Sequence, residues 1–275
     1  MIFLFLLQIL GCFQRTDVED MYDPNEIPEI LSVMTLNLAH GRANGRHQFL
    51  LPSAKFRKNL EMVASFIQAE SPDIIALQEA DGPSFWSGRF DHVDFLAQKT
   101  DLPHFFRGSH NQTKRLDYGT AILSNRTITH VNDVRFIRYA PLPAKGFVHT
   151  KIQLTEGKEL HLVSIHLDPL RSSVRKKQLD VLIQNLQEEK EPLIIMGDFN
   201  TGWSVTLSEL CQKLSVKAYQ PESQEAWLNT FPKAQKRLDW ILISEELDFA
   251  EYTVHSNPIS DHYAVSAKVK LNNMR

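Results

Sequence analysis

The sequence has little cysteine, no excess of positive charge and only one long apolar run. Two of its 275 residues are cysteines, too few for a disulfide framework or for a zinc site built from several cysteines. The formal net charge is −3, so the surface does not favour polyanions in general, and a nuclease of this composition would need a local basic patch. No internal repeat or low-complexity segment is present, which excludes repeat and fibrous architectures.

The apolar run lies at the N-terminus, from Met1 to Phe13, and is interrupted only by Gln8. It is short for a membrane span and resembles the apolar region of a secretory signal, and residues 9–12 (Ile-Leu-Gly-Cys) resemble a bacterial lipobox. We therefore expect export, with a lipidated Cys12 as the new N-terminus and membrane anchor, or secretion. No Lys or Arg precedes the run, so the alternative is a misplaced start or a buried first strand in a cytoplasmic protein.

An acidic, proline-containing segment follows from Arg15 to Glu29 and is typical of a tether. Residues 1–29 are thus predicted to precede a single folded domain of residues 30–275, expected to be a monomer. Its composition, 43% hydrophobic and 23% charged, is ordinary for a globular protein that forms its own core. Cys211 lies in an apolar-periodic stretch and is expected to be a buried small hydrophobic residue.

The order of apolar patterns predicts an α/β protein with two mixed sheets packed face to face and helices outside each. Strands are predicted at residues 30–38, 73–78, 104–108, 120–123, 134–138, 146–154, 160–167, 193–196, 237–243, 252–255 and 262–269. Helices are predicted at residues 55–70, 91–99, 172–186 and 205–214, and a hairpin is predicted around residues 155–158.

Polar side chains follow several of these buried strands. The apolar run of residues 193–196 stops at Gly197 and is followed by Asp198 and Asn200, which point the same way if the chain is extended. Glu79 follows another buried strand, where a carboxylate is costly unless a cation or metal pairs with it, and Asn37 ends a third strand. These oxygen-bearing groups suit Mg²⁺ and a phosphate ester, although each alone is also compatible with a solvated strand end or a turn.

Two histidines at strand ends have carboxylates nearby. His166 ends one strand and is expected to donate to a phosphate oxygen, with Asp168 orienting it or a loop. Asp239 opens a strand and is predicted to fix the tautomer of His262, which then takes a proton from water, while Asp261 serves the metal or the leaving group. The other nine histidines, including those at positions 149, 161 and 255, are treated as background.

These motifs resemble, in order, those of the endonuclease/exonuclease/phosphatase superfamily, which includes deoxyribonuclease I, apurinic endonucleases, inositol polyphosphate 5-phosphatases and neutral sphingomyelinases. The resemblance covers about residues 31–269. The matching positions are Asn37, Gln78-Glu79, residues 118–123 (Tyr-Gly-Thr-Ala-Ile-Leu), His166-Leu167-Asp168, residues 197–200 (Gly-Asp-Phe-Asn), Arg237-Leu238-Asp239 and Ser260-Asp261-His262.

The resemblance implies a deoxyribonuclease I-like, four-layer α/β/β/α sandwich. It also implies hydrolysis of a phosphate ester by in-line attack of water, with Mg²⁺ as cofactor and Mn²⁺ as a substitute. The implied catalytic positions are His166, Asp198, Asn200, Asp239 and His262, and the implied metal positions are Asn37, Glu79 and Asp261. Two departures are visible: Ala39 stands where some relatives have a metal-binding side chain, and Thr120 replaces the asparagine of a Gly-Asn-Ala motif.

The substrate is less well defined. Trp86, in the aromatic loop after Glu79, Tyr118, Asp168 and Arg171 are predicted to bind it. An exported enzyme without general positive charge favours phospholipid headgroups or small phosphodiesters. The alternatives are an exported metal-dependent endonuclease or exonuclease, and an inactive scaffold that binds a partner.

Overall fold

The computed structural model describes residues 27–45, 51–113, 115–221 and 226–271. The predictions for the apolar N-terminal segment, including Cys12, and for most of the acidic tether lie outside these residues. Within the described ranges, no helix is long and apolar enough to cross a membrane.

One sheet has seven strands and contains the first strand of the fold. Its strands are β1 (Ile30–Asn37), β2 (Ile74–Asp81), β3 (His104–Arg107), β4 (Asn111–Gln112), β5 (Asp117–Ser124), β12 (Asp248–His255) and β13 (Ala264–Lys270). The order is β12-β13-β1-β2-β5-β3, with β4 also paired to β5. Only β1 and β2 run parallel among these pairs, so their carboxyl ends share one edge of the sheet.

The second sheet has six strands in the order β10-β11-β9-β8-β7-β6. These are β6 (Ile128–Arg135), β7 (Gly146–Thr155), β8 (Lys158–His166), β9 (Leu193–Asp198), β10 (Val216–Ala218) and β11 (Asp239–Ser244). Here β8 and β9 are the parallel pair. The predicted hairpin is the two-residue connection between β7 and β8, where Gly157 has φ 75°.

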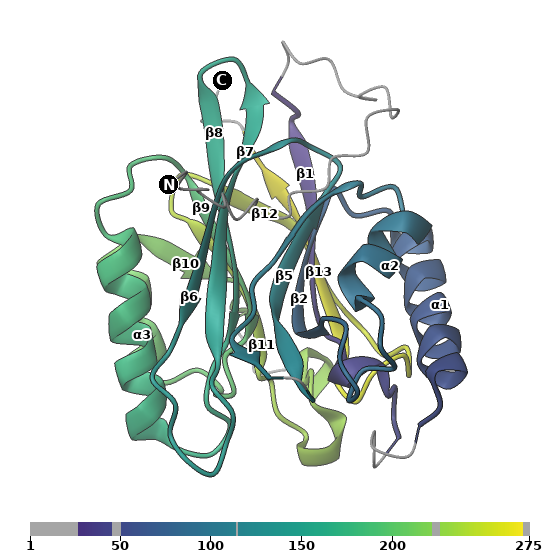
Figure 1. The fold of residues 1–275 in the computed structure, drawn as a ribbon. Helices are drawn as coiled ribbons and strands as arrows, with labels where there is room; N and C mark the ends of the chain where they lie inside the picture. The colour runs from purple at the N-terminus through teal and green to yellow at the C-terminus, as the bar shows by residue number, and fades with distance from the viewer. Residues whose placement is uncertain (1–26, 46–50, 114, 222–225, 272–275) are drawn as a thin grey trace, which may run out of the picture.

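Helices cover the outer face of each sheet, as Figure 1 shows. α1 (Ser53–Glu70) and α2 (His92–Lys99) lie on the first sheet, and α3 (Ser172–Leu186) and α4 (Val205–Leu214) lie on the second. Three short 3-10 turns complete the described elements: Ala39–Gly41, Ala226–Leu228 and Pro232–Ala234.

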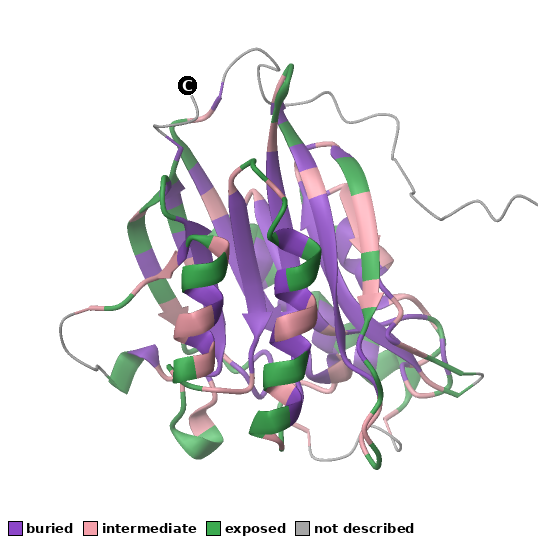
Figure 2. Ribbon diagram, turned by 90° about the vertical axis from the view of Figure 1, so that its left-hand side faces the viewer, coloured by how far each residue is buried: buried purple, intermediate pink, exposed green. Residues whose placement is uncertain are grey.

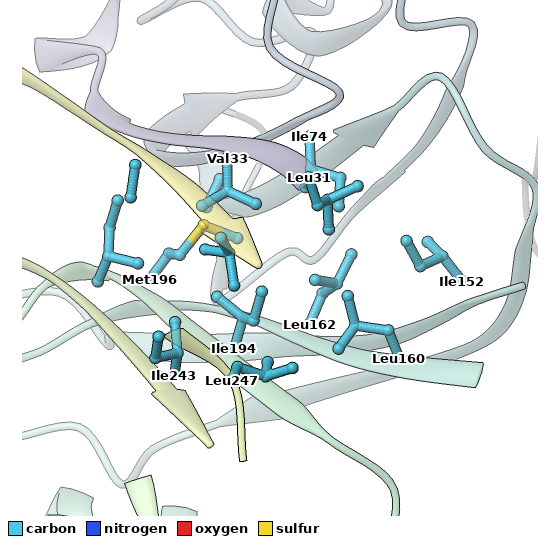
Figure 3. Packing of buried hydrophobic residues seen from close by; sticks show 14 of the residues in the cluster. Leu31, Val33, Ile74, Ile152, Leu160, Leu162, Ile194, Met196, Ile243 and Leu247 are labelled. Atoms are coloured by element: carbon cyan, nitrogen blue, oxygen red, sulfur yellow. The ribbon is translucent and has the colours of Figure 1, made fainter. Parts of the chain in front are cut away.

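The apolar side chains form three cores that separate four layers. The central core joins the two sheets and includes Leu31, Val33, Ile194 and Met196 (Figure 3). A second core packs α1 and α2 on the first sheet, and a third packs α3 and α4 on the second. The predicted α/β/β/α sandwich of two mixed sheets is confirmed.

Local sequence explains where the helices begin. Asp91 precedes α2, and its Oδ1 accepts hydrogen bonds from the backbone N–H groups of Val93 (2.8 Å) and Asp94 (3.0 Å). Ser204 caps α4 in the same way through Leu207. Such side-chain acceptors satisfy N–H groups that have no partner within the helix.

The prediction of a strand at residues 134–138 was wrong in its position. The strand there, β6, spans Ile128–Arg135, and Phe136 follows it as part of the core beneath α3. β6 is an edge strand with few buried positions (Figure 2), so its polar face carries no continuous apolar signal. The short strands β4 and β10 were missed because two or three residues show no periodicity.

Gly197, directly before Asp198, has a backbone conformation at the end of β9 that a residue with a side chain could not adopt without strain. Its φ is 147°, and a Cβ there would lie 2.1 Å from the carbonyl oxygen of Ile165. Gly197→Ala is therefore expected to lower the free energy of unfolding by about 3 kcal/mol. Gly157→Ala is the matched control, because nothing lies within 4 Å of its Cβ, and it is expected to cost about 1 kcal/mol. Urea denaturation measures both, and equal costs would contradict the steric account.

Candidate active site

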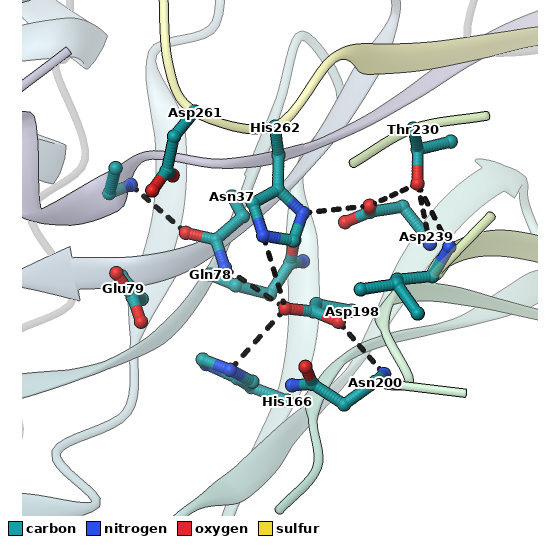
Figure 4. A network of polar contacts seen from close by, with 12 residues as sticks. Asn37, Gln78, Glu79, His166, Asp198, Asn200, Thr230, Asp239, Asp261 and His262 are labelled. Atoms are coloured by element: carbon teal, nitrogen blue, oxygen red, sulfur yellow. Dashed lines mark hydrogen bonds and ion pairs between the residues drawn. The ribbon is translucent and has the colours of Figure 1, made fainter. Parts of the chain in front are cut away.

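The strand register brings polar side chains from both sheets to one edge. Asn37 at the end of β1 pairs with Gln78 of β2, and His166 at the end of β8 pairs with Asp198 of β9. Asp239, the first residue of β11, lies opposite Asp198. Figure 4 shows these side chains converging from strands that are far apart in the sequence.

Asp198 lies at the centre of this group and is buried. Its Oδ2 accepts a hydrogen bond from Asn37 Nδ2 (3.1 Å) and lies 3.5 Å from His166 Nε2 and 3.9 Å from His262 Nε2. Its Oδ1 accepts from the backbone N–H of Asn200 at 2.8 Å. Asn200 has a φ of 50°, so the chain turns sharply after β9 and aims this N–H back at the carboxylate. One oxygen of Asp198 therefore contacts groups from both sheets.

The pKa values of Asp198 and His262 are both raised, but burial contributes to them with opposite signs. Burial raises the pKa of Asp198 to about 7, and the charge of Asp239 adds to the increase. For His262, burial alone would lower the pKa, but the charges of Asp239 and Asp198 outweigh it and raise the pKa to about 10. The site thus holds an imidazolium beside a carboxyl group that exchanges its proton near neutral pH.

A hydrogen-bond chain fixes the orientation of His262. Its Nδ1 lies 2.9 Å from Asp239 Oδ2, and the same oxygen accepts a 2.6 Å hydrogen bond from the hydroxyl of Thr230. The hydroxyl oxygen in turn accepts from the backbone N–H groups of Leu238 and Asp239, both at 3.0 Å. Asp239 thus cannot rotate without breaking contacts, and His262 presents Nε2 to Asp198.

Glu79 lies within β2, although the sequence indicated that it follows the strand. It sits at a β-bulge between Gln78 and Ala80, with a φ of 50°. Bulges next to active sites redirect a side chain, and this one aims the carboxylate at His40 Nε2 (3.2 Å) and Lys145 Nζ (3.8 Å). Burial would raise the pKa of Glu79, but these two cations outweigh it and lower the pKa. Glu79 is therefore held as a carboxylate.

Lys145, just before β7, also contacts His166. Its Nζ lies 3.1 Å from His166 Nε2 and 3.3 Å from Nδ1. Burial lowers the pKa of His166 well below its ordinary value, and the charge of Lys145 adds to the decrease. His166 is thus neutral. Burial also lowers the pKa of Lys145, although the charges of Glu79 and Asp198 oppose this decrease.

Asp261 lies on the other side of the site. Arg42 Nη2 contacts its Oδ2 at 2.8 Å, and Lys233 Nζ contacts the same oxygen at 3.4 Å. Burial raises the pKa of this carboxyl group, but the hydrogen bond and charge of Arg42 outweigh burial and lower it. The carboxylate at the predicted metal position is therefore ionised and held in place.

These groups line a cavity of about 350 Å³. Its lining includes four side chains whose oxygen atoms could bind a divalent cation: Asn37, Glu79, Asp198 and Asp261. Carboxylate and amide oxygens are the ligands that hard cations such as Mg²⁺ prefer. The donor set therefore fits the cation that the sequence implied.

A second cavity of about 450 Å³ adjoins the first and shares Asn200, Lys236 and Leu238 with it. It is lined by the indoles of Trp203 and Trp240 and by basic side chains. The guanidinium of Arg237 lies 3.8 Å above the ring of Trp240, which holds both groups in place.

The four residues predicted to bind substrate lie outside the lining of both cavities. Arg171 Nη2 contacts Asp168 Oδ2 at 2.7 Å, and Asp168 Oδ1 accepts from the backbone N–H groups of residues 170 and 171, so this pair holds the start of α3. Tyr118 is buried, and its ring lies 5.1 Å from that of His40, while the ring of Trp86 lies 5.8 Å from His40.

Four residues of the site were not identified from the sequence: His40, Arg42, Lys145 and Thr230. His40 was grouped with the background histidines, yet its Nδ1 contacts Asp81 at 2.8 Å and its Nε2 contacts Glu79. All four lie outside the strands, where no apolar period marks a position. The sequence offered one indication of His40, namely that it lies only three residues after Asn37, a predicted site residue.

The two departures from the family pattern have local consequences. Asn37 Oδ1 accepts a hydrogen bond from the backbone N–H of Ala39 at 2.9 Å. The side chain of Ala39 has no polar atom, so only its backbone holds the side-chain amide of Asn37. Thr120 is buried, and its hydroxyl lies 3.0 Å from His110 Nε2. Thr120 therefore pairs with a neighbouring histidine and lines neither cavity.

Fold and site together define a protein with an acid, amide and imidazole cluster at the common edge of two stacked sheets. The profile of the Endonuclease/Exonuclease/phosphatase family matches residues 34–262, and the chain belongs to this family. Members of the family are generally hydrolases, phosphatases or nucleases, and are typically metal-dependent. A comparison with curated proteins finds no match.

Several solved structures share the fold. An endonuclease/exonuclease/phosphatase from Beutenbergia cavernae is 17% identical with a TM-score of 0.72, covering 89% of this chain and 72% of that one. The human Nocturnin catalytic domain with bound sulfate is 20% identical with a TM-score of 0.68, covering 88% and 94%. A mannosyl-6-phosphatase from Bacteroides thetaiotaomicron is 17% identical with a TM-score of 0.64, covering 87% and 99%.

The charge state of His262 provides a test of the site without substrate. In metal-free protein its imidazole should remain protonated well above pH 7, and Asp239→Asn should lower its pKa because the largest opposing charge is removed. NMR titration of the imidazole measures both. The control is Asp133→Asn, which removes the carboxylate beside His110 and should leave His262 unchanged. An unshifted pKa in Asp239→Asn would contradict the assigned pairing.

Proposed function

We propose that this protein is a Mg²⁺-dependent hydrolase of small phosphate esters, in which water attacks phosphorus in line. One observation carries the proposal. Asp198 contacts Asn37 and His166 from different sheets, while His262, held by its own carboxylate, faces it inside one cavity. A scaffold that only binds a partner has no need for this arrangement, because buried charges are costly to keep.

We place the cation on the side of the cavity that contains Glu79, because oxygen-bearing side chains lie there. Asn37, Glu79 and Asp261 would hold it, and Asp198 lies next to them. Bound there, the cation would polarise the phosphoryl oxygens and offset their charge. Lys145 Nζ lies on the same side, 3.8 Å from Glu79, and its ammonium group would attract the phosphate to this part of the cavity.

The pKa shifts support one assignment of the proton-transfer roles. A base works best when its pKa lies near the operating pH, and Asp198, with a pKa of about 7, meets this condition. We therefore assign the proton of the attacking water to Asp198, with Asn200 orienting the carboxylate. His262, with its raised pKa, is positively charged and would stabilise the phosphoryl oxygens. This assignment differs from the sequence-based expectation that His262 is the base.

Cavity size and lining support small substrates. The two adjoining cavities, of about 350 and 450 Å³, lie within the usual size range of small-molecule sites. The phosphate would lie in the first, and the alcohol part would extend over Asn200 into the second. There Trp203 and Trp240 offer faces for a ring, and Lys236 and Arg237 offer donors for its polar substituents.

Removal of either central side chain should reduce turnover. His262→Ala and Asp198→Ala are each expected to lower kcat by about two to four orders of magnitude. This is the range of acid–base contributions for Asp198, and the loss of charge stabilisation at His262 is of similar size. Steady-state assays with a generic phosphodiester measure this. The control is His255→Ala, a partly buried histidine on β12 paired with Ser266, whose loss should leave kcat within about twofold. Normal turnover in Asp198→Ala would remove it from the mechanism.

A substrate panel tests both metal and substrate. Sugar phosphates, inositol phosphates, a generic phosphodiester, sphingomyelin vesicles, plasmid DNA, abasic DNA and RNA are compared with Mg²⁺. We expect turnover of small soluble esters that chelator abolishes and Mg²⁺ or Mn²⁺ restores. Full activity in excess chelator would contradict the metal dependence. Preferred cleavage of nucleic acid, weakening steeply with salt, would favour the nuclease alternative.

A further inference from the structure

A second cluster of ligating side chains lies on β7, β8 and the loop that joins α3 to β9. His149 of β7 and His161 of β8 point from neighbouring strands to the outer face of the second sheet. Their rings are 4.9 Å apart, and His149 Nε2 lies 3.0 Å from His161 Nδ1. Glu189 and Glu191, in the loop after α3, approach the other nitrogen of His161 at 3.7 Å and 3.4 Å.

This cluster is separate from the active site. His161 and His166 belong to the same strand, five positions apart, which corresponds to about 16 Å of extended chain. The side chain of His161 is fully buried, while Glu189 and Glu191 are partly exposed, so an ion could enter from solvent. The cluster therefore has an inner wall of imidazole and an outer wall of carboxylate.

One atom at the centre of the cluster is unsatisfied. Among the described residues, no hydrogen-bond partner contacts His161 Nε2, although the atom is buried. Its two carboxylate neighbours are within ion-pair range but do not make a hydrogen bond with it. A buried nitrogen without a partner is costly, and a ligand bound between the imidazoles and the carboxylates would satisfy it.

We propose that His149, His161 and Glu189 bind a transition-metal ion of the Zn²⁺ class at a site distinct from the active site. One ligand atom from each of the three lies within 4.8 Å of the others. The ion would bind His161 through its unsatisfied Nε2, which is the nitrogen that faces Glu189 and Glu191. His149 would join through its Nε2 after release of the 3.0 Å hydrogen bond to His161 Nδ1. Glu189 closes the set by a rotation of its side chain.

The ligand types select the ion. Imidazole nitrogens suit Zn²⁺, Co²⁺, Cu²⁺ and Ni²⁺, whereas Mg²⁺ and Ca²⁺ prefer oxygen. Two nitrogens and one carboxylate therefore discriminate against the hard cation that the active site would hold. Glu191, which contacts the same imidazole as Glu189, is in reach of a fourth position.

The charges and protonation states agree with a cation site. Burial lowers the pKa of His149 to about 3 and also lowers that of His161, so both imidazoles are neutral and keep a lone pair at pH 7. Lys151 Nζ lies 3.6 Å from Glu189 Oε2, and its positive charge would repel a bound cation. The two carboxylates outnumber it, and its partly exposed chain can turn toward solvent when an ion binds.

The test uses the full chain without a histidine tag, in a Glu79→Gln, Asp198→Asn, His262→Gln background so that the active site does not bind zinc. Zn²⁺ is titrated by calorimetry in excess Mg²⁺, and Co²⁺ is followed by its visible absorption. We expect one equivalent of Zn²⁺ and tetrahedral Co²⁺ bands. In that background, His149→Gln should weaken binding by about 10- to 100-fold or more.

The matched control is His255→Gln, a partly buried histidine of the other sheet, which should bind Zn²⁺ unchanged. Glu189→Gln, at a partly exposed loop position, also tests the site if His149→Gln does not fold, and should weaken binding in the same direction. Failure to bind Zn²⁺ at micromolar concentration would overturn the proposal, as would equal affinity in the Glu189→Gln and control proteins. Either result leaves the proposed hydrolase function untouched.

Discussion

The contact of Asp198 with groups from both sheets is the constraint on which the site depends. Its Oδ2 is shared by Asn37 of the first sheet and by His166 and His262, so the sheets must stack in one register for the cluster to form. The central core sets this register, because its apolar side chains interdigitate and allow little sliding (Figure 3). Packing far from Asp198 therefore determines the distances at the site. The site depends on the apolar parts of the strands as well as on their polar ends.

The strand ends could be predicted from sequence because each joins a buried apolar run to a polar residue. That pattern located Glu79, His166 and Asp198, and the resemblance placed them in one site. It could not give the bulge at Glu79, since an extra residue in a ladder leaves no mark in the apolar period. Lys145 and Thr230 could not be found for a related reason: they come from loops, and only tertiary structure shows which loop residue points inward.

The central strands of the fold were predicted from the sequence more accurately than the edge strands. Central strands such as β1, β2, β8 and β9 are buried on both faces and have long apolar runs, whereas β6 has one polar face and was displaced in the prediction. Arg171 shows a similar limit for the prediction of substrate-binding residues. A basic residue near an active-site strand has the same sequence signature whether it binds substrate or pairs with a neighbour, and here it pairs with Asp168.

The β7–β8 hairpin has a consequence for protein engineering. Lys145 precedes one strand and His166 ends the other, so the active-site end of the hairpin is functional, while the turn at Gly157 lies about 30 Å of extended chain away. No Cβ contact surrounds Gly157. This turn is therefore a suitable place for a circular permutation or an inserted reporter domain, since opening the chain there leaves both strands joined to the site.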